Sequence, residues 1–188
     1  MNTKPKLFSS IAIIPLGRVD LEILTSLCKR LEDIFGEISC KVEAALPPID
    51  QAYDSTRRQY NSSKILAALD KLSVDIDADR ILGVAEFDLF VPGLNFVFGE
   101  AQCPGEVALI SLFRLKPQFY SLDHDDELFM QRITKEAMHE LGHTMGYGHC
   151  SNPDCIMFFS NSIVDTDRKS ARFCEECART LWGNYKIG

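Results

Sequence analysis

The sequence lacks any uninterrupted apolar run of about 18 residues, the length that suggests a membrane-spanning helix. It also lacks a basic excess, because 20 Lys and Arg oppose 27 Asp and Glu and give a formal charge of −7 with neutral His. Such a balance offers no electrostatic footprint for nucleic acid or an anionic membrane surface. Internal repeats and low-complexity segments are absent too. We therefore expect a globular protein whose 188 residues form one domain with a substantial core.

A secretory signal is also poorly supported. The apolar segment Leu7–Leu16 follows two lysines, which is the coarse order of such a signal, but no small-residue cleavage pattern comes after it. Arg18, Asp20 and Glu22 follow at once. We interpret Leu7–Pro15 as a buried first β-strand and expect a cytoplasmic protein.

Seven cysteines are present, an odd number, and in a reducing compartment a disulfide framework is disfavoured. Cys28, Cys40 and Cys103 are scattered along the chain, and we expect them to be small buried hydrophobic residues. The other four fall within 28 residues near the C-terminus and need a separate explanation.

Hydrophobic periodicity predicts the order of elements in the first half of the chain. The predicted elements are a helix over Asp20–Phe35 capped by Gly36, a strand over Ile38–Leu46, an exposed loop over Gln51–Asn61, and a helix over Ser62–Leu72 with Ser62 or Ser63 as N-cap. Strand-like segments follow at Ile81–Phe90, Asn95–Ala101 and Val107–Leu115. The β-α-β-α-β order predicts parallel strands, and the short turns after it favour an antiparallel strand near an edge.

A long helix is predicted to end near Met145 and to begin in the acidic segment Asp123–Glu127. A carboxylate metal site is conceivable in that segment, but helix capping by negative charge is the better interpretation. One apolar stripe of the helix faces the core. His139 and His143 lie on a different face, and we expect this face, with Arg132 and Glu136 above the histidines, to line a cleft.

Residues 139–149 fit the pattern HExxHxxGxxH. His139 and His143 are one helical turn apart and can converge on one ion, while Gly146 lets the chain leave the helix so that His149 can return as a third ligand. Three imidazoles with an open fourth position form a catalytic zinc site. Glu140 lies beside the metal without being a ligand, so we predict that it is the general base for a zinc-activated water.

The clustered cysteines have the spacings of a zinc site with four thiolate ligands. Cys150 and Cys155 have four residues between them, and Cys174 and Cys177 have two. Disulfides or free thiols are the alternatives, and a second, structural zinc is the interpretation we favour. Because Cys150 follows His149 directly, the structural ion would hold the third catalytic ligand in place.

Residues 139–177 resemble the archaemetzincin family, in the metzincin clan of zinc peptidases. The family combines the histidine motif with a Cys directly after it, a Cys-x-Met turn and a later Cys-x-x-Cys, which here are Cys150, Cys155-Ile156-Met157 and Cys174-Glu175-Glu176-Cys177. The resemblance implies zinc at both ligand sets, Glu140 as base and Met157 as the floor of the catalytic site. Phe158 and Phe159 stand where some metzincins place a tyrosine ligand, so none is expected here.

The resemblance also implies an α/β (α+β) fold. We expect a twisted, mixed five-stranded sheet with one antiparallel edge strand, backed by helices that include the active-site helix. Residues 1–188 would form a single metallopeptidase domain, with the sheet and active-site helix in residues 1–146. Residues 147–188 would form a small C-terminal subdomain that holds the four-cysteine zinc site.

We thus predict a zinc-dependent peptidase, acting as a monomer on peptides or proteins that add to the edge strand Asn95–Ala101. One alternative is a zinc-stabilised binding module with an idle peptidase site, although such a module has no use for Glu140. Nucleic-acid binding through the four-cysteine element is disfavoured, because Glu175, Glu176 and the overall negative charge oppose it.

Overall fold

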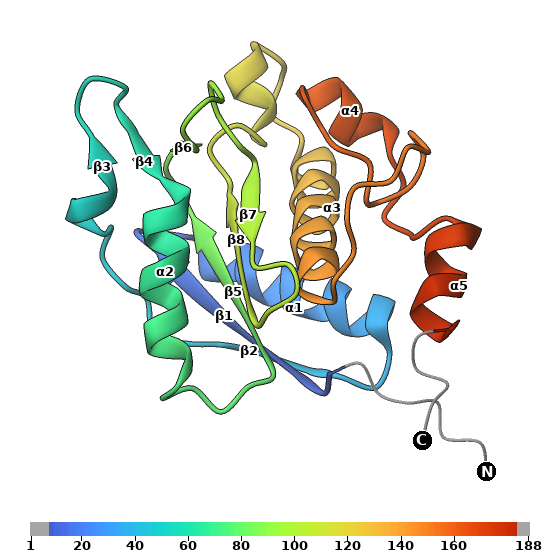
Figure 1. Cartoon of the computed structure of the whole chain (residues 1–188). Coiled ribbons are helices and arrows are strands. Elements are labelled where there is room, and N and C mark those ends of the chain that lie inside the picture. The colour runs from blue at the N-terminus through green and yellow to red at the C-terminus, as the bar shows by residue number, and fades with distance from the viewer. Residues whose placement is uncertain (1–7, 184–188) are drawn as a thin grey trace.

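The fold is a mixed sheet between helical layers, seen in a computed structural model that describes residues 8–183 (Figure 1). The five-stranded sheet contains β1 (Ser10–Leu16), β2 (Ser39–Val42), β5 (Arg80–Ala85), β7 (Gly99–Ala101) and β8 (Val107–Ser111), in the order β2-β1-β5-β8-β7. All neighbours pair in parallel except β7, which runs antiparallel to β8 at the edge. The predicted sheet and its antiparallel edge strand are confirmed, although β7 is shorter than the predicted strand.

Helices cover both faces of this sheet. The helices are α1 (Leu21–Phe35), α2 (Ser62–Ser73), α3 (Asp126–Thr144), α4 (Ile163–Arg168) and α5 (Glu175–Gly183). Successive side chains of β1 point to opposite faces of the sheet and so contribute to two cores. Ile11 and Ile13 pack with α1 and α3, whereas Ala12 and Ile14 pack with α2. A strand that is buried on both faces has an almost continuous apolar sequence, as Leu7–Leu16 has.

The ends of α1 and α2 show one confirmed and one wrong prediction. Gly36 ends α1 with φ 82°, a conformation that glycine adopts without steric cost. The cap of α2 is Asn61, whose side-chain oxygen accepts the backbone N–H of Lys64 at 3.1 Å. Ser62 and Ser63, the predicted caps, are the first two helical residues instead.

The segment Gln51–Asn61 is ordered structure, contrary to the predicted exposed loop. It contains η1 (Asp50–Ala52), β3 (Tyr53–Asp54) and β4 (Gln59–Asn61), and β4 pairs with β6 (Leu89–Phe90) in a small sheet. A further short helix, η2 (Pro117–Tyr120), precedes α3. Local polarity is therefore a poor guide to this segment, because its order comes from partners distant in the sequence.

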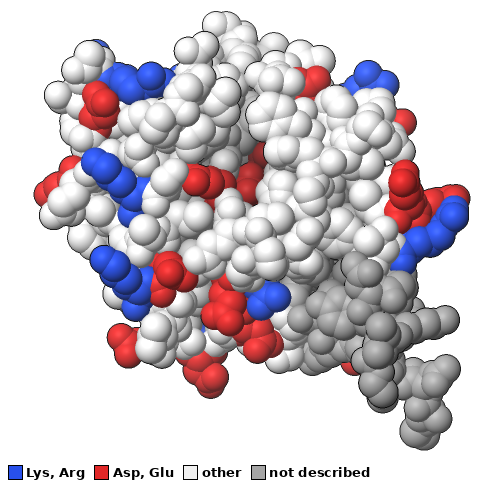
Figure 2. All heavy atoms as spheres, in the orientation of Figure 1, with Lys and Arg blue, Asp and Glu red and all other residues white. Residues whose placement is uncertain are grey.

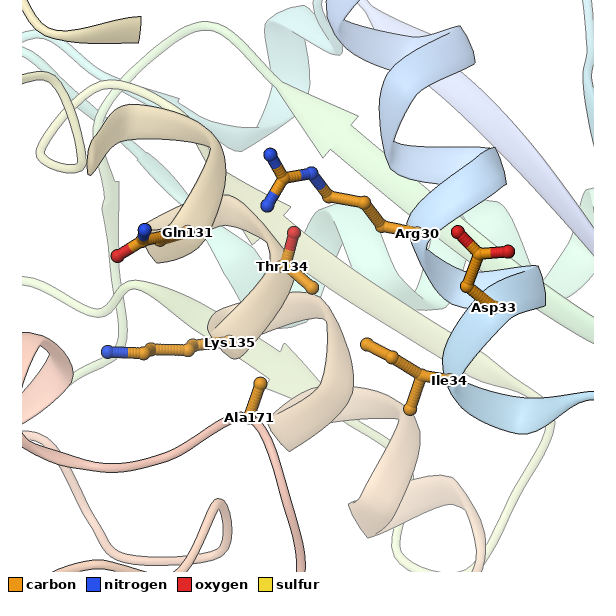
Figure 3. A pocket seen from close by; sticks show the side chains of 7 residues that line it. All are labelled: Arg30, Asp33, Ile34, Gln131, Thr134, Lys135 and Ala171. Carbon is orange, nitrogen blue, oxygen red and sulfur yellow. The ribbon is translucent and has the colours of Figure 1, made fainter. Parts of the chain in front are cut away.

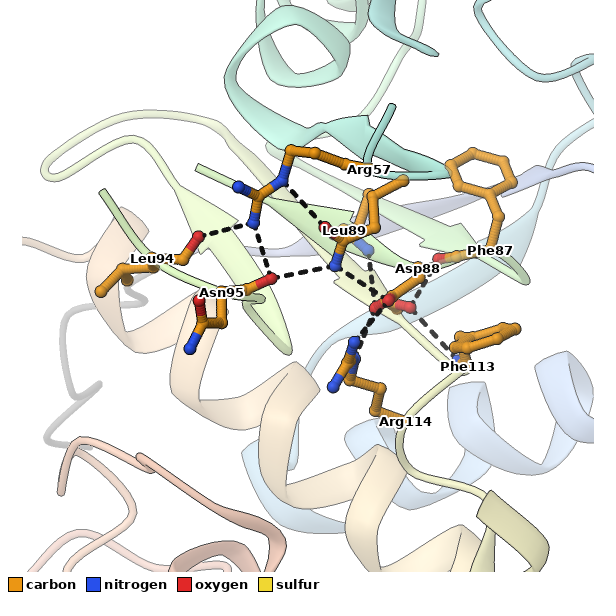
Figure 4. A network of polar contacts seen from close by, with 10 residues as sticks. Arg57, Phe87, Asp88, Leu89, Leu94, Asn95, Phe113 and Arg114 are labelled. Carbon is orange, nitrogen blue, oxygen red and sulfur yellow. Dashed lines mark hydrogen bonds and ion pairs between the residues drawn. The ribbon is translucent and has the colours of Figure 1, made fainter. Parts of the chain in front are cut away.

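A buried carboxylate is one of those partners (Figure 4). Asp88 receives two hydrogen bonds from Arg114, both at 2.7 Å, and one from the side-chain amide of Gln59 at 2.9 Å. Arg57 extends the network by donating to the backbone oxygens of Leu94 and Asn95, each at 2.9 Å. The network ties the β3–β4 hairpin to the loop that leads into β7.

The scattered cysteines differ from the prediction. Cys28 and Cys40 form a disulfide that joins α1 to β2, with a Cα–Cα distance of 5.2 Å. They are adjacent because α1 packs on the sheet where β2 pairs with β1. Cys28 is buried in the core as predicted, and Cys40 packs against it. Cys103 is a free and exposed thiol, so the prediction that it is buried is wrong.

The polar face of α3 is covered by the C-terminal segment, so the prediction that Arg132 and Glu136 line a cleft is wrong. Arg132 is 1% exposed and forms a two-fold hydrogen bond with Asp167, each contact at 2.7 Å. Glu136 accepts a hydrogen bond from Thr166 at 2.9 Å. Lys169 Nζ lies 3.0 Å from Glu136 Oε1 in a buried ion pair, without the alignment of a hydrogen bond.

A separate pocket of about 370 Å³ lies between α1 and α3 (Figure 3). Arg30 and Ile34 of α1 face Gln131 and Lys135 of α3 across it. None of the predicted site residues lines this pocket. Among the described helices, none is long and apolar enough to cross a membrane.

Replacing Lys169 with Met should lower the free energy of unfolding by about 3–5 kcal/mol, because Glu136 is then buried without a counter-charge. Urea unfolding of the zinc-loaded proteins measures the change. The double variant Lys169→Met/Glu136→Gln is the control, and it should be more stable than the single variant. A single variant as stable as the wild type would show that the ion pair does not constrain the fold.

Candidate active site

The two helical histidines point toward each other. His139 and His143 each direct Nδ1 at a backbone oxygen, that of Ile156 at 2.7 Å and that of Tyr147 at 2.6 Å. Nδ1 must therefore carry the proton, which leaves a lone pair on each Nε2. The two Nε2 atoms lie 3.1 Å apart. Two lone pairs at this distance repel each other unless a cation lies between them.

His149 completes the set. Gly146, with φ 90°, turns the chain out of α3, and His149 returns so that ligand atoms of all three histidines lie within 4.8 Å of one another. The ring of Phe159 packs against His149 with centroids 4.8 Å apart, and it offers no ligand atom. The structure thus brings together the three histidines that the motif predicts.

The histidines fit zinc in both spacing and protonation. Tetrahedral zinc with Zn–N bonds of about 2.0–2.1 Å separates its nitrogen ligands by about 3.3 Å, close to the 3.1 Å between His139 and His143. Burial lowers the pKa of all three histidines, that of His139 most strongly. Neutral imidazoles are the form that binds a metal.

Glu140 lies against the edge strand. Its pKa is raised well above the usual range by burial and by the neighbouring Glu136, while Lys169 opposes the shift. A Cβ atom at Gly99 would lie 2.6 Å from both Oε1 and Cγ of Glu140. The absence of a side chain at Gly99 therefore makes room for the carboxylate between α3 and β7.

Met157 lies under the helical turn that joins the two histidines. It is fully buried, and its sulfur occupies the space that a Cβ atom at Gly142 would need. This is the position that the family resemblance implies. Gly99 and Gly142 are functional positions that sequence reasoning missed, because a glycine carries no sign of what fills the space beside it.

The four clustered cysteines also converge. Cys150 and Cys174 have their Sγ atoms 3.8 Å apart, as do Cys155 and Cys177, and all four sulfurs lie within 4.8 Å of one another. Tetrahedral zinc with Zn–S bonds of about 2.3 Å separates its sulfurs by about 3.8 Å, whereas a disulfide needs about 2.05 Å. The cluster therefore has the geometry of a zinc site, and the disulfide alternative does not fit it.

The thiols of this cluster have different acidities. The backbone N–H of Cys177 donates to the sulfur of Cys174, and this hydrogen bond is the main reason that the pKa of Cys174 is lowered to about 7. Burial raises the pKa of Cys155 and of Cys177. A bound metal would have to displace the protons of the latter two thiols, so binding would release protons.

One segment connects the two ligand clusters. Cys150 follows His149, and its N–H donates to the oxygen of Met157 at 2.9 Å. Ile156, whose oxygen orients His139, follows Cys155 and donates its own N–H to the oxygen of Arg172 at 2.9 Å. A cation at the cysteines would therefore fix the backbone that orients His139 and presents His149.

The edge strand leaves backbone groups unpaired beside the site. Ser111 donates to the oxygen of Phe98 at 2.8 Å and Gln102 to that of Val107 at 3.0 Å, which sets the phase of the β7–β8 ladder. The N–H and C=O groups of Gly99 and Ala101 consequently point away from β8. They have no partner among residues 8–183. Figure 2 shows this face hollowed between the elements around β6 and those around α4, with acidic atoms in its depth.

Comparisons with known proteins show similarity along most of the chain. Residues 9–182 match the model of peptidase family M54. An archaemetzincin of Pyrococcus furiosus is 45% identical over 175 residues, which cover 91% of each chain. The crystal structure of the Methanopyrus kandleri archaemetzincin superimposes with a TM-score of 0.83 at 36% identity, covering 98% of this chain and 99% of that one. The archaemetzincin of Archaeoglobus fulgidus, solved with malonate, gives 0.79 at 41% identity, covering 90% and 98%.

Replacing Cys174 with Ser should reduce zinc at the histidines, although Cys174 contacts none of them, because it loosens the segment that carries His149. Zinc per chain, measured after dialysis against a weak chelator, should fall by more than one equivalent. The exposed Cys103→Ser variant is the control and should keep the wild-type content. A loss confined to one equivalent, with unchanged melting, would show that the two clusters are independent.

Proposed function

Because the chain belongs to peptidase family M54, the archaemetzincins, it is a zinc metallopeptidase, and we propose that it hydrolyses peptide bonds with Glu140 as general base. The proposed ligands of the catalytic zinc are His139, His143 and His149. The observation that carries the proposal is the convergence of the histidine ligand atoms next to Glu140, whose carboxylate lies between α3 and β7.

The chemistry divides between the metal and the chain. His139, His143 and His149 would hold a zinc ion, which would supply a water with a pKa lowered toward about 7 and would polarise the scissile carbonyl. Glu140 takes the proton of the attacking water and passes it to the leaving amine. Its position directly after His139 and against Gly99 of the edge strand supports this role.

The substrate would bind as an added strand. An extended peptide can pair with the outward N–H and C=O groups of Gly99 and Ala101. Since Gly99 also contacts Glu140, a peptide held at this edge lies beside the proposed base. This contact between strand and helix therefore sets the position of the substrate relative to the proton acceptor.

We further propose a second, structural zinc on Cys150, Cys155, Cys174 and Cys177. The 3.8 Å sulfur spacings support it, and four thiolates leave no open position for chemistry. Its role would be to hold the C-terminal subdomain, which is described as far as Gly183, against the sheet and α3. The single domain over residues 1–188 stays a prediction, and its residues 1–7 and 184–188 lie outside the described part of the chain.

Replacing Glu140 with Gln should lower kcat/KM by about 10²–10⁴-fold, because the amide cannot accept the proton. The assay follows cleavage of a mixed peptide library by mass spectrometry, and metal analysis should show unchanged zinc content. A zinc-loaded wild type that cleaves no peptide, or a variant as active as the wild type, would contradict the proposed mechanism. The former result would favour a binding module with an idle site.

Replacing Gly99 with Ala should lower kcat by about 10²-fold, because the added methyl group displaces either the Glu140 carboxylate or the edge strand. Both obstacles lie 2.6 Å away, and one of them is the backbone oxygen of Leu109, which cannot yield easily. Steady-state kinetics, with zinc content and melting temperature measured in parallel, tests this.

Gly148→Ala is the matched control for that experiment. A Cβ atom there meets nothing within 4 Å, so the same added methyl group should leave kcat nearly unchanged. Equal activity of the two variants would show that the contact between Gly99 and Glu140 does not matter for the reaction.

A further inference from the structure

Glu100, the central residue of β7, is placed to contact a bound substrate on the α2 side of the sheet. Neighbouring residues of a strand face opposite sides, so Glu100 points away from the face where Gly99 meets Glu140. Its carboxylate accepts hydrogen bonds from the hydroxyls of Ser62 and Ser63, the first two residues of α2. Glu100 is partly exposed, and the proposed mechanism does not use it.

The phase of the β7 ladder fixes what would lie opposite this side chain. A peptide that pairs antiparallel with the outward groups of Gly99 and Ala101 places one of its residues directly across from Glu100, at a position without hydrogen bonds of its own. Side chains at such positions share a face of the sheet, with Cβ atoms about 4.5–5.5 Å apart. The substrate side chain would therefore extend beside the carboxylate.

The charge of Glu100 has no counter-ion in the described part of the chain. Lys64, which follows Ser63 in α2, directs Nζ to the backbone oxygen of Gln51 at 3.1 Å. Gln102 follows β7 directly and lies on the same side of the sheet as Glu100. Its side-chain amide donates to Asp70 at 2.7 Å, which adds a second carboxylate to this side of the cleft. Because a carboxylate has about four acceptor sites, the two serines leave room for a cationic donor.

We propose that Glu100 is a specificity-determining residue, which selects Lys or Arg at the substrate position opposite the centre of β7. This inference rests on the proposed peptidase function and on binding by strand addition.

A purely structural role for Glu100 is the competing explanation, since a carboxylate at the N-terminus of α2 is favoured by the helix dipole. Glu100→Gln separates the two roles. The amide oxygen still accepts both serine hydroxyls, so α2 stays anchored, but the charge is lost. Glu43→Gln is the matched control, because it removes an equal charge next to β2, at the opposite edge of the sheet.

The experiment begins with a peptide that the zinc-loaded wild type cleaves, resynthesised with Lys, Gln or Glu at each position in turn. At one position kcat/KM should be about fivefold higher for Lys than for Gln, as expected for a partly exposed ion pair, and lower again for Glu. Glu100→Gln should cleave the Lys and Gln peptides with equal kcat/KM, whatever its overall rate, and Glu43→Gln should retain the wild-type ratio. A wild type without charge preference, or a preference that survives in Glu100→Gln, overturns the proposal and leaves the peptidase function standing.

A binding measurement separates failure of this inference from failure of the proposed function. Fluorescence anisotropy of the labelled Lys and Gln peptides is measured on zinc-loaded Glu140→Gln and on Glu140→Gln/Glu100→Gln. An affinity ratio of about fivefold that disappears in the double variant supports the role of Glu100 even if no peptide is cleaved. Equal affinities of the two peptides for Glu140→Gln, or no binding of either, overturn it.

Discussion

The orientation of two imidazole rings by backbone oxygens is the constraint on which the catalytic site depends. His139 and His143 lie on α3, but the oxygens of Ile156 and Tyr147 that hold their Nδ1 atoms belong to the segment that follows the helix. A helix that carried the same residues alone would leave both rings free to rotate. The lone pairs converge only once residues 147–157 pack against α3, so metal affinity and the packing of the C-terminal segment are the same event.

The contact between α3 and the C-terminal segment is polar, whereas most contacts of helices are apolar. Arg132 and Glu136 are buried under α4 and its C-terminal end, where Asp167 and Lys169 meet them at 2.7 and 3.0 Å. Buried charges contribute little net stability, yet they tolerate few alternative arrangements, since each displaced group would be left unpaired. The ion pairs therefore select one position for the C-terminal segment, while the apolar stripe of α3 supplies the stabilisation.

Local signals in the sequence were enough for the order along the chain of the five sheet strands and the first three helices. They were also enough to find the histidines and cysteines that converge as candidate metal ligands, because periodicity and motif spacing are properties of short segments. Contacts between distant segments were not predictable. Cys28 reaches Cys40 only because β2 pairs with β1 under α1. Asn61 caps α2, whereas the hydroxyl of Ser62, a predicted cap, donates to Glu100, which lies 38 residues further along the chain. Every residue type has a backbone oxygen, so no sequence pattern could predict which oxygens orient the histidines.

The free edge of β7 has a consequence for which proteins can be cut. Its outward N–H and C=O groups accept only a chain that is already extended and whose own backbone groups are unpaired. Backbone groups inside a folded protein are almost all engaged in helices and sheets. In the proposed mode of binding, the cleft thus selects unfolded segments, whatever side chains they carry. Cleavage of a folded protein would then proceed no faster than the local unfolding of the segment that enters the cleft.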